Sequence, residues 1–560
     1  MLHFNSKKFT AFAGIIIFLF AVTFYSCIKD YKKPFAKTDY EPLIAVPLIK
    51  TSMTINDLLL KDKNSGTIQV APDNFVTLVY RGKLLSLQAS DFIIFPSQSY
   101  SSTTPALTPA DITAFTGLPV GSNYSVTPYT QTIVFNTNNT ADIDSIIFQA
   151  GTTFDVNVSS MFMHNMSIKI DIPAAKKNGI PFSQTINLTY TGNLPVVSNN
   201  SFNVSGYTFD MTKGGTTQNT FDVNIAAVIT KSANPLNLSD NATLNIGFTN
   251  PKFQKLFGYI KQPLIAPGAD TVALTIFDNA MPGGGTFTIV NPDVHVAVTN
   301  SYGVPIDATF NLLEGFNPPA STYPISVAAE PKLNPWHLPY PTVVQIGQSV
   351  SDSVILSNTN TSNTLSNVIN QHPKKMIYKV NAQANPNGKP VAPNTNFSLD
   401  TSRVTIDLQI DLPLYGTAKN MLLRDTARIS MGTNIDQAEW ILFRIHAVNG
   451  FPIDMGLQAY FTDSVSAANQ YNVLDSLISP YQIIMPAAGV DASGKVNSPT
   501  TQTTDIKYDK TRLAGIKKAT KLIIQGKFNT TNNGNTNVKI YSDYKLDFQV
   551  GVEAQIKTKF

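Results

Sequence analysis

Apolar and polar residues alternate with a period of two along much of the chain after Pro42. Between Met166 and Ile172 every second residue is Met or Ile, and Ser, Lys and Asp stand between them. Between Val404 and Leu412 the same alternation places five aliphatic side chains on one face. A period of two is typical of β-strands that bury one face and expose the other. These two runs therefore predict long, half-buried strands.

Shorter runs of the same kind predict an all-β fold. They span residues 272–277, 286–290 and 294–298, with Gly or Asn-Pro turns between them. Charged residues make up only 14% of the chain, against a usual ~25%, and Thr, Ser, Asn and Pro supply the polarity instead. We expect several tandem antiparallel β-sandwich domains of the immunoglobulin-like kind.

Helical signals are few and short, and they predict connectors rather than a helical domain. They cover residues 55–61, 109–115, 252–259, 361–370 and 509–519. Thr54 and Asp57 form a candidate capping box for residues 55–61, and Thr108-Pro109 is a candidate start for residues 109–115.

The domain layout predicted from Pro-rich and Gly-rich breaks is linear. It consists of a signal peptide (1–26), a lipidated tether (27–41), an N-terminal β domain (42–150), a central β-sandwich region (151–345), a helix–strand connector (346–400) and a C-terminal β domain (401–560). Residues 544–560 alternate once more and predict a long strand that closes the C-terminal domain. An amphipathic strand ending in Phe560 also resembles the assembly signal of outer-membrane β-barrels, so a barrel is kept as an alternative.

The N-terminus has the layout of a secretory signal. Lys7 and Lys8 precede an apolar stretch that ends at Tyr25, and this stretch, of about 15 residues, is shorter than the ~20 needed for a membrane-spanning helix. Cys27 follows, and it is the only cysteine in 560 residues. The sequence Phe24-Tyr25-Ser26-Cys27 resembles a bacterial lipobox, which implies acylation of Cys27, including palmitate, and outer-membrane delivery. Tyr25 departs from the small residue usual there, and an ordinary secretory peptide or an uncleaved anchor is the alternative.

Two further stretches resemble a group of uncharacterised lipoproteins from the Bacteroidota: residues 41–49 and 451–463. The resemblance implies an exported, lipid-anchored β protein and no known activity. A second likeness is to the Asp-Ser/Thr-aliphatic sequence that is O-glycosylated in that phylum. Its acceptors here are Ser145, Thr271, Ser353, Thr426, Ser464 and Ser476. The alternative is that Asp-Ser and Asp-Thr simply begin strands.

Residues that could carry catalysis or bind a metal form no recognisable motif. No two of the six histidines (His3, His164, His295, His337, His372 and His446) have metal-ligand spacing. No nucleophile elbow, phosphate-binding loop or dinucleotide fingerprint is present. We therefore expect no enzyme, no metal and no cofactor. The net charge of +4 is too dilute for a nucleic-acid partner.

One loop is a candidate for ligand stacking. Trp336 and Tyr340 lie in the proline-rich segment 334–341, and prolines reduce the entropy lost when a loop binds a ligand. Rings held in such a loop could stack on sugar, whereas packing against a domain junction is the simpler interpretation.

The sequence thus favours a non-enzymatic, lipid-anchored envelope protein that acts as a binding or structural β-sandwich module of an outer-membrane assembly. Its partners would be the membrane through Cys27 and other envelope proteins or polysaccharide. Exposure on the cell surface is favoured over a periplasmic location. The alternatives are a glycan-binding or glycan-processing surface lipoprotein and an outer-membrane barrel.

Overall fold

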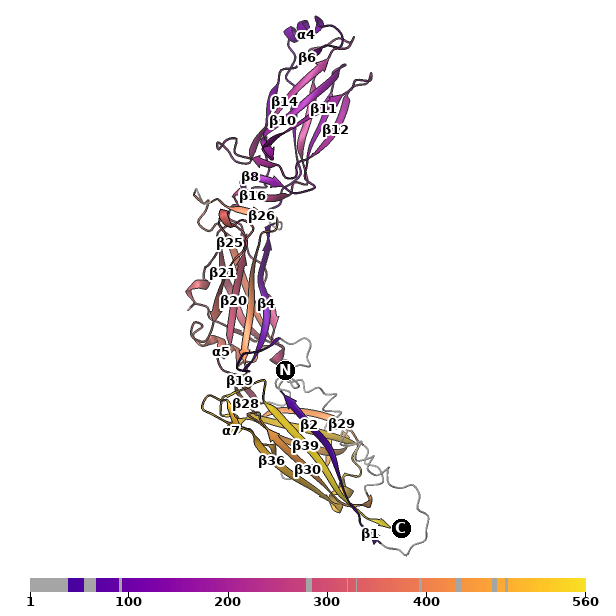
Figure 1. Cartoon of the computed structure of the whole chain (residues 1–560), viewed down its shortest axis with the longest axis vertical. Helices are drawn as coiled ribbons and strands as arrows, with labels where there is room; N and C mark the ends of the chain where they lie inside the picture. The colour runs from indigo at the N-terminus through magenta and orange to yellow at the C-terminus, as the bar shows by residue number, and fades with distance from the viewer. Residues whose placement is uncertain are drawn as a thin grey trace.

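The computed structural model describes residues 39–54, 67–89, 93–277, 285–319, 321–328, 330–391, 395–429, 436–465, 471–478 and 482–559. Strands hold 58% of the residues and helices 8%, and neighbouring strands of its sheets pair in antiparallel fashion. The predicted all-β class is confirmed. Figure 1 shows three β-sandwiches stacked in a line, which we call the upper, middle and lower domains.

The upper domain packs a nine-stranded sheet against a four-stranded sheet. The larger sheet contains β26 (Phe397–Leu399), β16 (Phe253–Tyr259), β8 (Asp142–Phe148), β13 (Thr208–Asp210), β10 (Asn165–Lys177), β14 (Thr220–Thr230), β6 (Asn123–Ser125), β11 (Ile180–Leu188) and β7 (Tyr129–Val134). The smaller sheet contains β12 (Val196–Asn203), β9 (Thr153–Ser160), β15 (Ala242–Thr249) and β5 (Gln98–Thr103). The ring of Phe248 lies between the sheets, 5.1 Å from that of Phe148 and 5.3 Å from that of Phe154. Aromatic contacts of this kind add to the free energy of apolar burial.

The middle domain also has two sheets. One contains β24 (Val350–Leu356), β20 (Asp293–Asn300), β27 (Arg403–Pro413), β4 (Val76–Gln88) and β3 (Thr67–Val70). The other contains β17 (Leu264–Ile265), β18 (Asp270–Ala273), β25 (Lys375–Ala384), β21 (Ile306–Asn317), β22 (Ser321–Pro324) and β23 (Trp336–Leu338). The alternating run in β27 buries every second side chain from Val404 to Leu412, and β10 does the same from Met166 to Ile172. Both predicted strands are confirmed.

The lower domain brings together the two ends of the described chain. Its first sheet contains β2 (Leu43–Thr54), β39 (Lys545–Ile556), β30 (Ala438–Asn449) and β36 (Thr500–Asp509). Its second contains β29 (Met421–Arg428), β37 (Lys521–Thr530), β31 (Ile453–Val465), β32 (Tyr471–Ser476) and β33 (Ile483–Met485). The smaller pairings are β1 (Asp39–Tyr40) with β40 (Thr558–Lys559), and β34 (Gly489–Val490) with β35 (Val496–Ser498). The predicted C-terminal strand is β39, which lies inside its sheet between β2 and β30.

The domains are nested in the chain rather than consecutive, which differs from the predicted boundaries at 150, 345 and 400. The chain leaves the lower domain after β2, crosses the middle domain in β4 and forms the upper domain from residues 93 to 259. It then returns through the middle domain to the lower one. The pairing of β2 with β39 joins segments about 500 residues apart in sequence, and a pairing of that range leaves no local pattern.

Four of the five predicted helices can be compared with the structure. Helices α4 (Pro109–Thr116), α5 (Thr364–Ile369) and α6 (Lys510–Ile516) are confirmed, with Thr108 and Asp509 as side-chain caps of α4 and α6. Residues 252–259 form strand β16 instead, and residues 55–61 lie outside the described residues. The remaining short turns are α7 (Thr531–Gly534), η1 (Thr275–Phe277), η2 (Pro331–Leu333) and η3 (Val343–Gln345). Within the described residues no helix has the length and apolar character needed to span a bilayer.

Strands continue across both joints between domains. At the upper joint β26, which precedes β27 in the chain, adds an edge strand to the sheet of the upper domain by pairing with β16. At the lower joint β19 (Thr286–Ile289), β28 (Tyr415–Lys419) and β38 (Val538–Lys539) form a small sheet between the middle and lower domains. Backbone hydrogen bonds thus link neighbouring domains at each joint of the stack shown in Figure 1.

Candidate binding surface at the tip of the upper domain

Four loops meet at the end of the upper domain that lies farthest from the lower domain (Figure 1). We call this surface the tip and define it as residues 104–122, 161–164, 189–195 and 231–241. The first loop carries α4, and the others connect β9 to β10, β11 to β12 and β14 to β15. Loops held by a rigid sandwich are common places for binding residues.

Hydrogen bonds join the loops of the tip into one surface. The backbone N–H of Gly121 donates to the carbonyl of Lys231 at 2.8 Å, and that of Met161 donates to the carbonyl of Asn241 at 2.8 Å. The side-chain amide of Asn234 donates to the carbonyl of Met163 at 2.9 Å. Three of the loops are therefore joined directly, and the fourth, 189–195, is attached through the backbone N–H of Tyr190, which donates to the side-chain oxygen of Asn165 at 2.9 Å.

Each loop of the tip exposes one large apolar side chain. The exposed fractions are 68% for Val120, 43% for Met161, 38% for Leu194 and 54% for Leu238. Scattered exposed apolar residues are normal, but several that gather on one surface are typical of an interaction site.

The charged side chains of the tip form hydrogen bonds within the upper domain. The Nζ atom of Lys231 donates to the carbonyls of Thr116 at 2.5 Å and Leu118 at 2.6 Å, so it fastens the end of α4. The carboxylate of Asp111 accepts from the hydroxyl of Thr108 at the start of α4, and this hydrogen bond lowers the pKa of Asp111. Asp240 accepts from the backbone N–H of Asn237 at 2.8 Å. The outward surface of the tip is consequently almost uncharged.

Beneath α4 lies a buried histidine. His164 is 1% exposed, and its ring centroid lies 4.8 Å from that of Phe115. The backbone N–H of Ser232 donates to Nδ1 at 3.2 Å, which requires that Nδ1 carry no proton. Burial lowers the pKa of His164, in agreement with a neutral ring. This histidine supports the tip from below and is not offered to solvent.

The outer face of β12, β9, β15 and β5 is a second surface with unusual composition. One row across the sheet places Asn199, Asn157, Asn245 and Ser101 side by side, and its neighbours carry mainly Ser and Thr. Asp155 is the one carboxylate on these strands, and it accepts from Ser201 at 2.6 Å and Thr249 at 2.5 Å. Burial favours a higher pKa for Asp155, but the hydroxyl donors outweigh it and lower the pKa. The face is mainly polar and offers amide and hydroxyl groups.

The predicted stacking loop is not a ligand platform in this structure. Trp336 is 0% exposed, and its Nε1 donates to the carboxylate of Asp352 at 3.2 Å. Lys332 lies over the same ring, with its Nζ 5.8 Å from the centroid. Tyr340 is 41% exposed, but Trp336, which was expected to offer a second ring beside it, is buried. Trp336 thus packs inside the middle domain, because burying a large aromatic ring is more favourable than leaving it in water.

The six Asp-Ser/Thr acceptors are all in strands, and one pair, Asp270-Thr271, begins its strand. The other five acceptors lie in the middle or toward the end of a strand. Thr271, Ser353 and Thr426 are exposed, whereas Ser145 and Ser476 are half-buried. Ser464 lies in β31, and its side chain is outside the described set. Their glycosylation stays a prediction.

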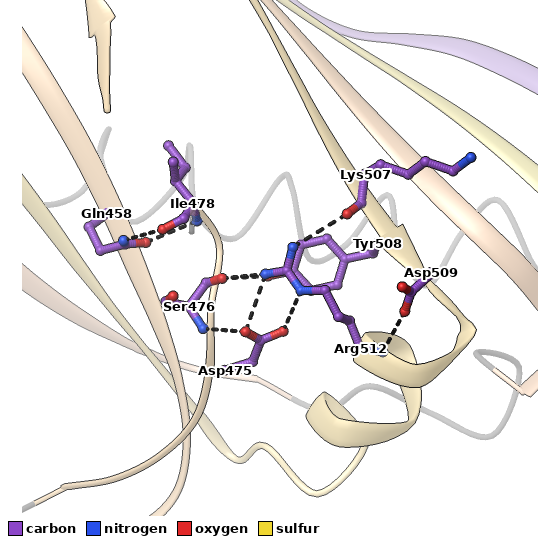
Figure 2. A network of polar contacts seen from close by, with 8 residues as sticks. All are labelled: Gln458, Asp475, Ser476, Ile478, Lys507, Tyr508, Asp509 and Arg512. Atoms are coloured by element: carbon purple, nitrogen blue, oxygen red, sulfur yellow. Dashed lines mark hydrogen bonds and ion pairs between the residues drawn. The ribbon is translucent and has the colours of Figure 1, made fainter. Parts of the chain in front are cut away.

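Ser476 belongs to a polar network in the lower domain (Figure 2). Arg512 donates to both carboxylate oxygens of Asp475, at 2.9 and 3.2 Å, and to the carbonyl of Ser476 at 2.5 Å. Its guanidinium lies 3.9 Å from the ring centroid of Tyr508, and Asp509 caps α6 by accepting from the N–H of Arg512. A planar guanidinium suits this forked contact. The network fastens α6 onto β32 and β36 and exposes no free nucleophile.

The middle domain holds a further cluster of titratable groups, in β20 and β27. Asp293 stands opposite Asp411 in neighbouring strands, and Nε2 of His295 lies 3.1 Å from the Asp411 carboxylate. Burial raises the pKa of Asp293, and Asp411 adds to the shift. Within the described part of the chain no group of His, Cys, Asp or Glu has the geometry to hold a metal ion. Cys27 lies outside the described residues.

Comparisons with known proteins give no family. No family model matches the chain, and no curated protein does either. Among solved structures, a protein of Parabacteroides distasonis described as secreted is 13% identical, with a TM-score of 0.27 over 52% of this chain and 82% of its own. The VP2 subviral particle of infectious bursal disease virus is 8% identical, with a TM-score of 0.13 over 98% of this chain and 86% of its own. Parabacteroides belongs to the Bacteroidota, but likenesses this distant carry no argument about function.

The tip was missed by reasoning from sequence because it joins loops that are far apart in the chain. A signal was nevertheless present. Residues 104–122 contain one charged residue and residues 189–195 contain none. Only the fold brings these two segments of low charge together.

Proposed function

We propose that this protein is a non-enzymatic component of the cell envelope, anchored by lipid at Cys27 on the outer membrane, which presents the tip of its upper domain to a partner. The observation that carries the proposal is the position of the two ends. Asp39, which follows Cys27 by 12 residues, enters the lower end of the lower domain, while the tip lies at the opposite end of the stack (Figure 1). A link of that length spans at most about 40 Å, so an anchored chain would hold the tip away from the membrane.

The chemistry of the tip favours a protein partner with an uncharged, partly apolar surface. Val120, Met161, Leu194 and Leu238 supply apolar contact. Hydrogen bonds join the loops of Val120, Met161 and Leu238, and the loop of Leu194 is attached to Asn165 at the start of β10. A surface fixed before binding loses less entropy when it binds.

Anchoring is tested by palmitate labelling of cells that carry the native chain or Cys27→Ala, together with protease shaving of intact cells. Label that depends on Cys27, with loss of the protein on shaving, supports a surface lipoprotein. Label with protection from protease moves the protein to the periplasmic side, and absence of label removes the anchor.

The tip is tested by photo-crosslinking in cells. A crosslinking residue at Val120 or Leu238 is expected to give the same adduct, and one at Val344, which is 91% exposed in the middle domain, is expected to give none. Met161→Asp should weaken the adduct from both tip positions. Equal adducts from Val120 and Val344 would contradict a partner at the tip.

Glycan binding is the second candidate, because the Asn and Ser row of the upper domain offers neutral hydrogen-bonding groups to a neutral polysaccharide. Affinity electrophoresis against neutral glucans tests it. Retardation that is abolished by Asn157→Lys, at an exposed central position of the row, would favour this function over the first.

A further inference from the structure

The outer face of the lower domain carries a small apolar patch at the end where the described chain begins. Leu43 of β2 and Trp440 of β30 both lie opposite Gln555 of β39. In the next row Ala45 and Leu442 flank Glu553 in the same way. We call Leu43, Ala45, Trp440 and Leu442 the lower patch.

The side chains of the lower patch point away from the core. In β30 the neighbouring Ile441 is 2% exposed and packs inside the domain, so Trp440 and Leu442 face outward and are only half-buried. Leu43 is 60% exposed. One of the two tryptophans of the chain therefore faces outward, in the same row as an exposed leucine and separated from it by Gln555.

The ring of Trp440 has polar neighbours, as tryptophan rings at a membrane–water interface do. Its Nε1 donates to the side-chain oxygen of Gln555 at 2.5 Å, and Nζ of Lys507 lies 4.7 Å from its ring centroid. Tryptophan is enriched where one end of the ring is apolar and the other is wet, as at the headgroup level of a bilayer. Lysine can keep its charge in water while its stem covers apolar surface.

The position of the patch indicates what covers it. Leu43 follows Tyr40 of β1 by three residues, at the end of the domain that the anchored segment enters (Figure 1). We propose that the lower patch rests on the lipid surface to which Cys27 is anchored. This inference rests on the proposed lipid anchor and adds to it a second, direct contact between the folded domain and the bilayer.

Because the protein is anchored, a small patch is sufficient for contact with the bilayer. Tethering turns the second contact into an intramolecular event with a high effective concentration, so weak apolar insertion can be populated. In β36 Lys507 lies opposite Leu442 and Asp509 lies opposite Trp440, and in β39 Glu553 lies opposite Leu442. The patch therefore has no excess of positive charge, and the contact does not require anionic lipid. Neutral phosphatidylcholine should therefore support it.

Tryptophan fluorescence gives a direct test, because the second tryptophan, Trp336, is fully buried in the middle domain. The full lipidated protein is reconstituted in phosphatidylcholine vesicles with or without brominated acyl chains. Bromine quenches tryptophan at short range, so we expect quenching in the native protein and its loss in Trp440→Phe. The remaining emission of Trp336 in that variant checks that the chain is folded.

Two further variants make the test specific. Leu43→Asp should reduce quenching of Trp440, whereas Ile355→Asp, at a position 49% exposed in the middle domain, should not. Flotation of the vesicles measures the anchor separately. Protein that floats without quenching overturns the lower patch and leaves the anchor intact, and protein that does not float overturns the proposed function itself.

Discussion

The side-chain amide of Asn385 donates to the side-chain oxygen of Asn396 at 2.8 Å, inside the joint between the middle and upper domains. Both residues are almost fully buried, at 1% and 2% exposed. The same amide nitrogen lies within 2.9 Å of the carbonyl oxygens of Ile260 and Lys261, which lead out of β16. One asparagine therefore satisfies the backbone where the chain leaves the upper domain.

Replacing Asn385 with Ala is expected to destabilise this joint by about 2 to 4 kcal/mol, because buried carbonyls lose their donor. Chemical denaturation measures the loss, and small-angle scattering should show a less extended stack. Asn385 has a φ of 45°, so Asn385→Gly separates the lost hydrogen bonds from backbone strain. Asn387→Ala, at an exposed position of the same loop, is the control. A stable Asn385→Gly protein would contradict the role of the amide.

The stability of the upper domain should depend on pH through His164. Burial lowers its folded pKa below the unfolded value of about 6.5, so the unfolded state binds more protons in this range. Stability is then full above about pH 6.5 and falls as the pH decreases toward the folded pKa. Protonation of Nδ1 would also break its contact with the N–H of Ser232.

Calorimetry between about pH 8 and pH 5, a range that spans the titration of histidine, measures this effect. His164→Asn keeps an acceptor for Ser232 without a titratable ring, and it should flatten the dependence on pH. Asn193→Ala, which removes an exposed uncharged side chain of the tip, should leave the dependence unchanged. A native profile that is already flat would contradict the neutral buried state.

Strand β16 shows why the sequence predicted a helix where the structure has a strand. The large apolar residues Phe253, Leu256 and Ile260 follow one another at spacings of three and four, which is a helical spacing, and Asn250-Pro251 resembles a helix start. In the strand Gly258 is buried as well, so from Leu256 onward every second residue faces the core. The register with β8 shifts between Phe253 and Lys255 and again between Phe257 and Gly258. The first shift inserts one residue, Gln254, into β16, so the step from Phe253 to the next buried residue is three instead of two. The second shift leaves its extra residue, Asp144, in β8. Within its alternating run β10 carries no such shift, and its sequence predicted it correctly.

The nesting of domains and the tip could not be predicted for a different reason. Alternation tells which face of a strand is buried but not which strand lies beside it. β39 was expected to close a domain, and only its pairing with β2 shows that the domain is shared by both ends. The exposed loops of the tip carry no pattern of their own, so their meeting depends entirely on those long-range pairings.

The contact between Asp475 and Arg512 should stabilise the lower domain. Both side chains are mostly buried, and the forked geometry is charge-assisted, so a double-mutant cycle with Asp475→Asn and Arg512→Lys should give a coupling of about 1.5 to 3 kcal/mol. Arg512→Lys keeps the charge but loses the fork and the planar contact with Tyr508. The exposed pair of Arg444 and Asp505 is the matched control, and its cycle should show little coupling. Equal coupling in both cycles would mean that burial of the network in Figure 2 does not increase the coupling free energy.

If the Asp-Ser/Thr sequences are glycosylated on the folded protein, exposure should decide which of them are used. Thr271, Ser353 and Thr426 expose their side chains, whereas the carbonyl of Ser476 is held by Arg512 and its side chain is half-buried. Peptide mass mapping of the protein from its native host should find sugar on the three exposed acceptors and none on Ser476. Thr271→Val should remove sugar from its own peptide alone, because valine keeps the shape and lacks the hydroxyl. Bare hydroxyls at all three exposed positions would leave these sequences with a structural explanation, since the carboxylates of Asp270 and Asp352 accept from the next backbone N–H at 2.7 and 2.8 Å.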